Sequence, residues 1–144
     1  MRTLSAFLPA LAFAASAYAD PAAIAGTWLN GDGDGLIEIR ADGRDIRGTI
    51  LGSPIEDPDR PKTDIHNPDP ALRDRLLVGL TILSGFSYDG DGAWSGGFVY
   101  DPNNGKTYRA KLKLTGQDTL KLRGYIGISL IGRTETWTRQ PSGT

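Results

Sequence analysis

The sequence contains no cysteine, and its only histidine is His66. Without thiols the chain can form neither a disulfide nor a zinc–thiolate site, and thiol catalysis is excluded. A single imidazole does not make a conventional multi-histidine metal site, and no Ser-His-Asp set can be assigned from the spacing. The sequence therefore predicts neither a bound metal nor a cofactor.

Neither sign of charge is in strong excess, and long apolar runs are missing. The 16 basic and 17 acidic residues nearly balance, which gives no indication of a nucleic-acid or anionic-membrane partner. The uncharged, mostly apolar stretch of residues 4–15 falls short of the ~20 residues that span a bilayer. We therefore expect no integral membrane anchor.

That stretch fits a cleavable secretory signal instead. Arg2 supplies a positive start before it, and Ala17-Tyr18-Ala19 supplies a small-residue cleavage site after it. These are the physical parts of a signal peptide. We expect residues 1–19 to be removed and residues 20–144 to work as one domain in the periplasm or outside the cell.

Glycine, in contrast, is frequent at 19 residues and separates short runs of alternating polar and apolar residues. Asp-Gly and Asn-Gly pairs between such runs are typical of tight hairpins. Eight such runs predict an all-β fold, a single antiparallel up-and-down barrel, with a two-sheet sandwich as the alternative. The residues expected to form strands are 26–29, 36–40, 45–51, 83–88, 93–100, 107–114, 119–125 and 133–139.

Alternation also suggests which aromatic residues belong to the barrel interior. Trp94, Phe98 and Tyr100 are expected to share one face of their strand, as period-two alternation requires. With Tyr108 they could line a ligand pocket or form ordinary core. An eight-stranded barrel allows either, because its interior is just wide enough to be filled or to hold one small ligand.

The last expected strand combines charged residues with a tryptophan. One side of it carries Arg133, Glu135, Trp137 and Arg139, and the other side carries three threonines. Since tryptophan favours burial, we expect the first side to face inward. Arg139, near the chain end, is expected to stack on Trp28. Arg133 is expected to meet the acidic group of a ligand unless Glu135 already neutralises it.

An insertion over residues 52–79 interrupts the strand pattern. Its polar cluster could bind a polar ligand or a metal, or move a proton, and consists of Lys62, Asp64, His66, Asn67 and Asp69. Each residue also has a local structural use, such as Asp69 capping an expected helix over residues 71–77, and we favour that interpretation.

Two acidic runs resemble parts of a calcium site. Asn30, Asp32 and Asp34 match the first half of an EF-hand loop, and residues 87–92 echo it. The twelfth position is Ala41, where such a loop requires a bidentate glutamate. Hairpin turns account for both runs, so no calcium site is predicted.

Gly26-Thr27-Trp28 in the first strand and Arg139 in the last resemble the lipocalin-like superfamily. In those barrels the indole of a Gly-x-Trp motif closes the floor, and an arginine late in the last strand commonly packs across it. The resemblance implies that these residues hold the fold together.

A closer resemblance covers residues 26–139 and rests on several segments. They are 62–70 (KTDIHNPDP), 100–102 (YDP), 105–108 (GKTY), 122–125 (LRGY), 132–134 (GRT) and 137–139 (WTR). Together they are similar to the bacterial exported family catalogued as domain of unknown function 2147. The resemblance implies a lipocalin-like fold and export, but no reaction. Many members carry two cysteines where this chain has Asp42 and Arg47, so it lacks any bridge they would make.

These observations predict an exported lipocalin-like protein that binds a small amphipathic or acidic ligand. One alternative is an enzyme with a site under the loop around Asp64 and Asn67, which we do not favour, and another is a protein-interaction module that uses this loop. The residues expected to contact a ligand are Trp94, Phe98, Tyr100, Tyr108, Arg133, Asp64 and Asn67. Those expected to support the fold are Gly26, Trp28, Asp69, Trp137 and Arg139.

Overall fold

The computed structural model describes residues 20–127 and 132–141, and the expected signal peptide lies outside these residues. Within them the regular secondary structure is almost entirely β-strand, and no helix is long and apolar enough to cross a membrane. The elements are two short 3₁₀ helices, η2 (Pro21–Ile24) and η3 (Pro70–Leu72), and the strands β1 (Gly26–Leu29), β2 (Leu36–Asp42), β3 (Asp45–Gly52), β4 (Thr81–Ser84), β5 (Ser87–Gly90), β6 (Ala93–Asp101), β7 (Lys106–Gly116), β8 (Thr119–Tyr125) and β9 (Gly132–Arg139).

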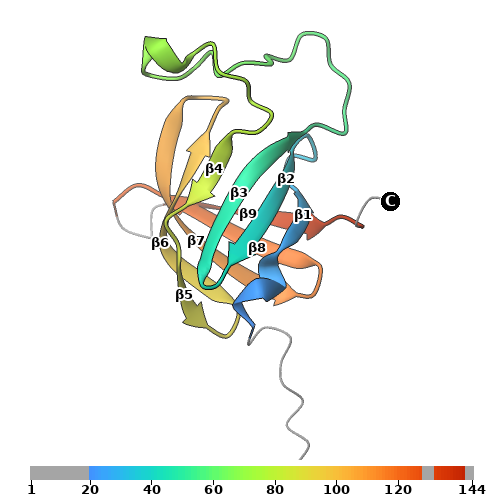
Figure 1. Cartoon of the computed structure of the whole chain (residues 1–144), viewed down its shortest axis with the longest axis vertical. Coiled ribbons are helices and arrows are strands. Elements are labelled where there is room, and N and C mark those ends of the chain that lie inside the picture. Colours follow the sequence, from blue (N-terminus) through green and yellow to red (C-terminus); the bar gives the residue numbers. More distant parts are fainter. Residues whose placement is uncertain (1–19, 128–131, 142–144) are drawn as a thin grey trace, which may run out of the picture.

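The strands form one antiparallel sheet that closes on itself (Figure 1). Hydrogen-bonded neighbours follow the order β4-β3-β2-β1-β9-β8-β7-β6-β5, and an additional pairing of β4 with β6 closes a ring of eight strands. β5 adds one further strand beside β6. The predicted up-and-down barrel is therefore confirmed.

The strand expected over residues 83–88 is two strands in the structure. Gly85 has a positive φ of 78°, a conformation that suits glycine and interrupts a strand. β4 before the break and β5 after it pair with different parts of β6. Phe86, directly after the break, lies in the core and is 5% exposed.

A β-bulge in β6 corrects a second expectation. The register of β6 with β7 shifts between Trp94 and Gly97, and Gly96 has a φ of 73°. Because a bulge inserts an extra residue, the side chains beyond it change faces. Trp94 is 1% exposed whereas Phe98 is 41% exposed, so these two aromatic residues do not share a face.

Large apolar side chains pack inside the barrel. The buried cluster is built mainly from isoleucine, leucine and tryptophan, and it comprises Ile24, Trp28, Ile37, Ile39, Ile46, Ile82, Leu83, Phe86, Trp94, Ala110, Leu112, Leu114, Leu120, Leu122 and Trp137. Their alternation with exposed residues along β7, and with half-buried residues along β8, is the pattern that the sequence predicts for one buried face.

One end of the barrel is closed by η2 and β1, and we call this end the floor. Trp28 is fully buried, and its Nε1 donates a hydrogen bond to the Ile24 carbonyl at 2.9 Å. The Arg139 guanidinium lies 4.4 Å from the centroid of the Trp28 ring. It also donates to the carbonyls of Ala23 and Ala25, each at 2.6 Å. The contact that the sequence predicts between the first and last strands is therefore present.

Residues 53–80, which connect β3 to β4, extend beyond the opposite end of the barrel (Figure 1), and we call them the strap. The helix expected over residues 71–77 is wrong, since only the 3₁₀ helix η3 forms. Asp69 does cap it, because its Oδ1 accepts a hydrogen bond from the Ala71 backbone N–H at 3.0 Å.

The strap pairs with itself after η3, which explains why no longer helix forms. The Asp64 N–H donates to the Arg75 carbonyl, and the Leu77 N–H donates to the Lys62 carbonyl, each at 3.0 Å. An isolated antiparallel bridge between residues 63 and 76 joins the same two segments. These contacts hold residues 75–77 extended and bring Arg75 next to Asp64.

Candidate functional site

The polar cluster of the strap surrounds a buried carboxylate. Asp64 has no exposed surface. The Tyr100 hydroxyl donates to its Oδ1 at 2.5 Å, and Asn67 Nδ2 and Arg75 Nε donate to its Oδ2 at 2.8 and 2.9 Å. Since Tyr100 belongs to β6, the cluster ties the strap to the barrel wall.

Electrostatics keep Asp64 ionised and Tyr100 protonated. Burial by itself raises the pKa of Asp64, but the hydrogen bonds from Tyr100, Asn67 and Arg75, with the Arg75 charge, bring that pKa below its usual value. Burial, and then the hydrogen bond to Asp64, raises the pKa of Tyr100 to about 12. A carboxylate that is ionised and accepts hydrogen bonds at both oxygens is suited to anchoring the strap. It is poorly suited to taking a proton from a substrate.

These pKa shifts predict how stability depends on pH. The pKa of Tyr100 is about 12 in the folded protein against about 10 in an unfolded chain. Its contribution to stability is therefore complete below pH ~10 and is lost as the pH rises towards the folded value. Asp64 acts at the acid end, because its lowered pKa gives a contribution that is complete above pH ~4 and is lost as the pH falls through the folded value.

We expect the stability difference between the wild type and a Tyr100→Phe variant to shrink when the pH is raised from about 8 to about 11. Urea unfolding at several pH values measures this difference directly. A difference that stays constant over the range would contradict the assignment of the alkaline loss to Tyr100.

The strap is attached to the barrel end at two further places. Gly105 in the β6–β7 turn packs so tightly on the strap that a Cβ there would lie 1.9 Å from the His66 carbonyl oxygen. Arg60 Nη1 donates to the Asp34 carbonyl in the β1–β2 turn at 2.8 Å and to the Ser53 hydroxyl at 2.5 Å. The segments 62–70, 100–102 and 105–108, which carry part of the family resemblance, thus meet at one structural junction.

We expect Gly105→Ala to destabilise the protein by about 2 kcal/mol and to loosen the strap. Gly105 has a φ of 72°, so a side chain would add both backbone strain and a clash with residue 66. Gly43→Ala is the matched control, since Gly43 has a φ of 61° with no atom within 4 Å of the added Cβ; its cost is about 1 kcal/mol. Thermal unfolding compares the two variants, and equal losses would show that the packing against the strap is unimportant.

The aromatic residues expected to line a pocket are dispersed. Trp94 is in the core with its ring 5.0 Å from that of Tyr88. Phe98 is on the outer surface beneath the Arg109 guanidinium, at 5.8 Å. Tyr100 holds Asp64, and the Tyr108 hydroxyl accepts a hydrogen bond from Asn104 at 2.9 Å. The structure does not bring these residues together around one ligand.

Arg133 does not face the barrel interior, so that expectation is wrong. Its side chain is 75% exposed and lies 3.7 Å from both Asp32 and Glu135. Trp137, on the same side of β9, is 3% exposed, and its Nε1 donates to Glu135 at 3.1 Å. Alternation places Arg133 on the same side of β9 as Trp137, but the residue is the second of the strand and its side chain lies beside Asp32 in the β1–β2 turn, exposed to solvent.

The acidic β1–β2 turn is organised by Asn30. Its Oδ1 accepts from the backbone N–H groups of Asp34 and Gly35, each at 3.0 Å, and its Nδ2 donates to the Asp34 carboxylate at 2.9 Å. In the described parts of the chain, no group of three or more His, Asp or Glu residues is placed to hold a metal ion. The turn therefore has a structural explanation of its own.

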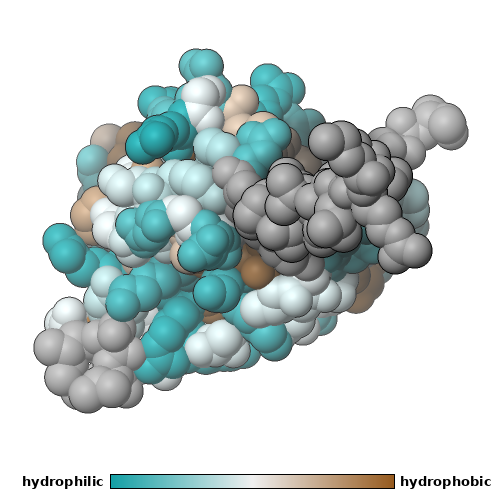
Figure 2. Space-filling model, turned by 90° about the horizontal axis from the view of Figure 1, so that it is seen from below, coloured by the Kyte–Doolittle hydropathy of each residue, from teal (hydrophilic) through white to brown (hydrophobic). Residues whose placement is uncertain are grey.

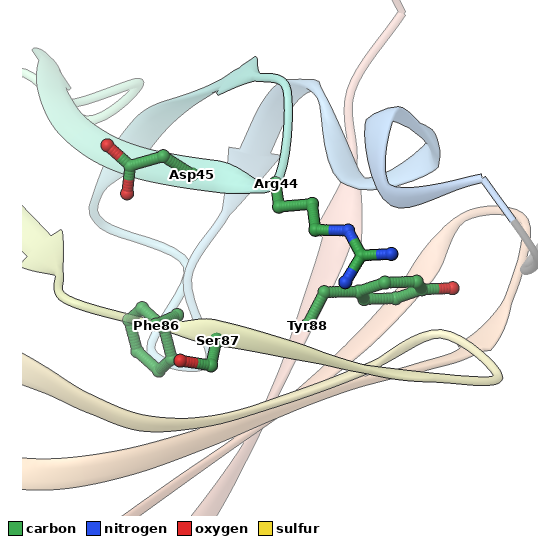
Figure 3. Close-up of a pocket in the computed structure, with 5 residues that line it drawn as sticks. All are labelled: Arg44, Asp45, Phe86, Ser87 and Tyr88. Carbon is green, nitrogen blue, oxygen red and sulfur yellow. The ribbon is translucent and has the colours of Figure 1, made fainter.

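A pocket that the sequence did not predict lies between the β2–β3 turn and β5 (Figure 3). Its volume is about 300 Å³, and its lining consists of Arg44, Asp45, Phe86, Ser87 and Tyr88. This volume is at the lower end of the range for small-molecule sites, about 300–1,000 Å³. In the sequence, this region is marked by a glycine, Gly85, inside the strand expected over residues 83–88. The structure breaks the strand at that glycine.

The molecular face around the floor is mainly hydrophilic. Figure 2 views the molecule from below, and the atoms that are not grey there are mostly teal or white, with separate small brown areas. A large continuous apolar patch is therefore missing from the part of this face that is visible.

Comparison with solved structures supports the fold assignment. Protein HP1028 from the human pathogen Helicobacter pylori, described as belonging to the lipocalin family, matches with a TM-score of 0.74 and 23% identity over 82% of this chain and 83% of that one. A redesigned β-barrel matches with a TM-score of only 0.46 and 17% identity over 85% of this chain and 96% of that one. The first likeness shows a lipocalin-like fold, and the second adds nothing to it.

Comparison at the sequence level identifies the family. No curated protein matches the chain. The model of a family described as uncharacterized proteins conserved in bacteria matches residues 26–139, which include every strand of the barrel. The chain therefore belongs to this family, DUF2147.

Proposed function

We propose that this protein is an exported lipocalin-like binding protein for a small amphipathic or acidic ligand. The observation that carries the proposal is the pocket of about 300 Å³ in the wall of a barrel that is closed at its floor. The pocket combines the apolar surfaces of Phe86 and Tyr88 with the charge of Arg44. The Asp45 carboxylate and the Ser87 hydroxyl complete the lining, so the recess offers two aromatic rings to an apolar body and one cation to an acidic group.

The strap cluster bears on the choice between binding and catalysis. An enzyme with its site under the strap would need titratable groups that converge on open space. Asp64 is instead fully buried and bonded to three side chains of the same chain. Asp64 and Asn67 are thus better explained as anchors of the strap than as groups that contact a ligand.

The proposed location is the periplasm or the extracellular medium. The signal-like pattern of residues 1–19 supports it, with Ala17 and Ala19 presenting small side chains to a peptidase. We expect N-terminal sequencing of the exported protein to begin at Asp20. Recovery of exported protein that still begins at Met1 would contradict cleavage at this site.

Matched ligands test the binding proposal. Protein that has been unfolded and refolded to remove carried ligands is titrated calorimetrically with decanoate, decanol and decyltrimethylammonium, which share an apolar tail and differ in charge. We expect decanoate to bind about tenfold more tightly than decanol, because a cation in the pocket favours an acid, and the ammonium compound to bind most weakly. The absence of binding by all three compounds, and by shorter and aromatic acids, would contradict the proposal.

A further inference from the structure

We propose that the ligand enters the barrel from the side, between β3 and β5, with its acidic group on Arg44 and its body turned towards the indole of Trp94. This inference rests on the proposed function and adds the site, the orientation and the chemical class. The favoured ligands are small carboxylic acids whose apolar body carries an additional oxygen, such as hydroxy or oxo acids.

The barrel wall is not closed by backbone hydrogen bonds at this place. β3 pairs with β4 through Gly48 and Thr49, and β5 pairs with β6. In residues 20–127 and 132–141, no strand pairing joins residues 45–47 of β3 to β5. We call the gap between these two strand segments the seam. The seam can widen without breaking a sheet ladder, so a ligand can part it at lower cost than elsewhere in the wall.

Arg44 supplies a cation at the seam. Figure 3 shows its side chain reaching from the β2–β3 turn to the Tyr88 ring, with the Asp45 carboxylate pointing away from it. Asp45 lies instead 3.9 Å from Arg47. Among the described residues, no ion pair involves Arg44, whereas Arg75 and Arg139 each have a carboxylate partner. An acid bound here would give Arg44 a counter-ion and a charge-assisted hydrogen bond.

Apolar residues lead inward from this cation. Phe86 is 5% exposed and packs directly on Gly97, where a Cβ would lie 2.4 Å from its ring. Tyr88 pairs with Trp94 across the β5–β6 ladder, and the centroids of the two rings are 5.0 Å apart. Tyr88 thus lines the pocket on one side and contacts the core on the other. Its hydroxyl accepts a hydrogen bond from the Gly92 N–H at 3.3 Å, so a ligand that reaches Trp94 has to displace this ring.

The inner end of this path has an unused hydrogen-bond donor. Trp94 is 1% exposed, and its Nε1 is buried without a hydrogen-bond partner. The other two indoles both donate, Trp28 to the Ile24 carbonyl and Trp137 to Glu135. Burial of an unpaired donor is unfavourable, and native structures rarely leave one without a reason. An oxygen on the ligand would satisfy it, which is why hydroxy and oxo acids are favoured.

Two substitutions on the β2–β3 hairpin test the position of the acid. We expect Arg44→Gln to weaken decanoate binding about tenfold and decanol binding less than about twofold. Arg40→Gln is the matched control, because the Arg40 side chain is 83% exposed and pairs with Glu38 on β2. It should leave both affinities unchanged. If the wild type binds decanoate and Arg44→Gln binds it equally well, the site is refuted while the binding function stands; if the wild type binds no acid, both fail.

The three indole N–H signals in a nitrogen–proton correlation spectrum test the inner end. A Trp94→Phe variant assigns the Trp94 signal, and addition of 3-hydroxydecanoate or 10-hydroxydecanoate to the wild type should shift it while the Trp28 and Trp137 signals move little. At least one hydroxy acid should bind to the wild type several-fold more tightly than decanoate does. In Trp94→Phe this advantage should be lost, so that the hydroxy acid and decanoate bind with equal affinity. An unmoved Trp94 signal on binding, or a hydroxyl advantage that persists in Trp94→Phe, would overturn the proposed orientation.

Discussion

Replacing Asp64 by alanine is expected to lower the free energy of unfolding by about 3 kcal/mol. The substitution leaves three donors without their acceptor, namely the Tyr100 hydroxyl, Asn67 Nδ2 and Arg75 Nε. Removing one partner of a buried ion pair typically costs about 3–5 kcal/mol. The lower end applies here because the Arg75 side chain is 37% exposed and can return to water. Urea unfolding of the purified variant measures the loss.

Asp69→Ala is the matched control for this prediction, since Asp69 lies in the same strap and caps η3 through a single hydrogen bond. We expect a loss of about 1 kcal/mol from this variant. Limited proteolysis should cut the strap of Asp64→Ala faster than that of Asp69→Ala. Equal stability and equal cleavage rates in the two variants would show that Asp64 does not anchor the strap.

Replacing Arg139 by alanine is expected to cost about 3 kcal/mol of stability, with or without a ligand. The guanidinium stacks on Trp28, donates to the backbone of η2, and donates through Nε to the Gln117 carbonyl at 3.0 Å. Its loss would leave several carbonyls without a donor and uncover an indole at the floor. Chemical unfolding, followed by tryptophan fluorescence, reports the change.

Arg133→Ala is the control on the same side of β9. The Arg133 side chain is 75% exposed, and its Nη2 lies 3.7 Å from a carboxylate oxygen of Asp32 and of Glu135. Removing this side chain should therefore cost less than about 0.5 kcal/mol of stability. Arg139→Lys should be destabilised almost as much as Arg139→Ala, because an ammonium cannot reproduce the fork of a guanidinium. Comparable losses in Arg133→Ala and Arg139→Ala would refute the special role of the floor contact.

The sequence was most informative where the local pattern is regular. The expected strand over residues 119–125 matches β8, in which the buried Leu120 and Leu122 alternate with less buried polar residues. The floor was also predictable, since Trp28 and Arg139 lie at defined positions in the first and last strands and are directly paired in the register.

Alternation failed where a glycine changes the backbone. The break at Gly85 and the bulge at Gly96 both have positive φ, and each changes which side of the strand later residues face. Phe98 was therefore assigned to the wrong face. Arg133 shows another limit, because alternation indicates the side of a strand but not how far along the barrel a residue lies.

Contacts distant in sequence were the hardest to predict. Asp64 and Asn67 stood out as a polar cluster, but their partner Tyr100 was expected to line a ligand pocket, and Arg75 was expected inside a helix. Their meeting depends on the strap folding back on itself and onto β6. The seam pocket was missed for the same reason, since Arg44 and Tyr88 come together only when the barrel has closed.

Native mass spectrometry of the protein purified from its own periplasm tests the proposed binding function most directly. The proposed function predicts a fraction of molecules with the mass of the chain beginning at Asp20 plus one small molecule, which is released on unfolding and identified as an acid. That fraction should fall in Arg44→Gln and persist in Arg40→Gln. A spectrum that shows only the unliganded chain, together with no binding of any acid by the refolded protein, would contradict the proposed function.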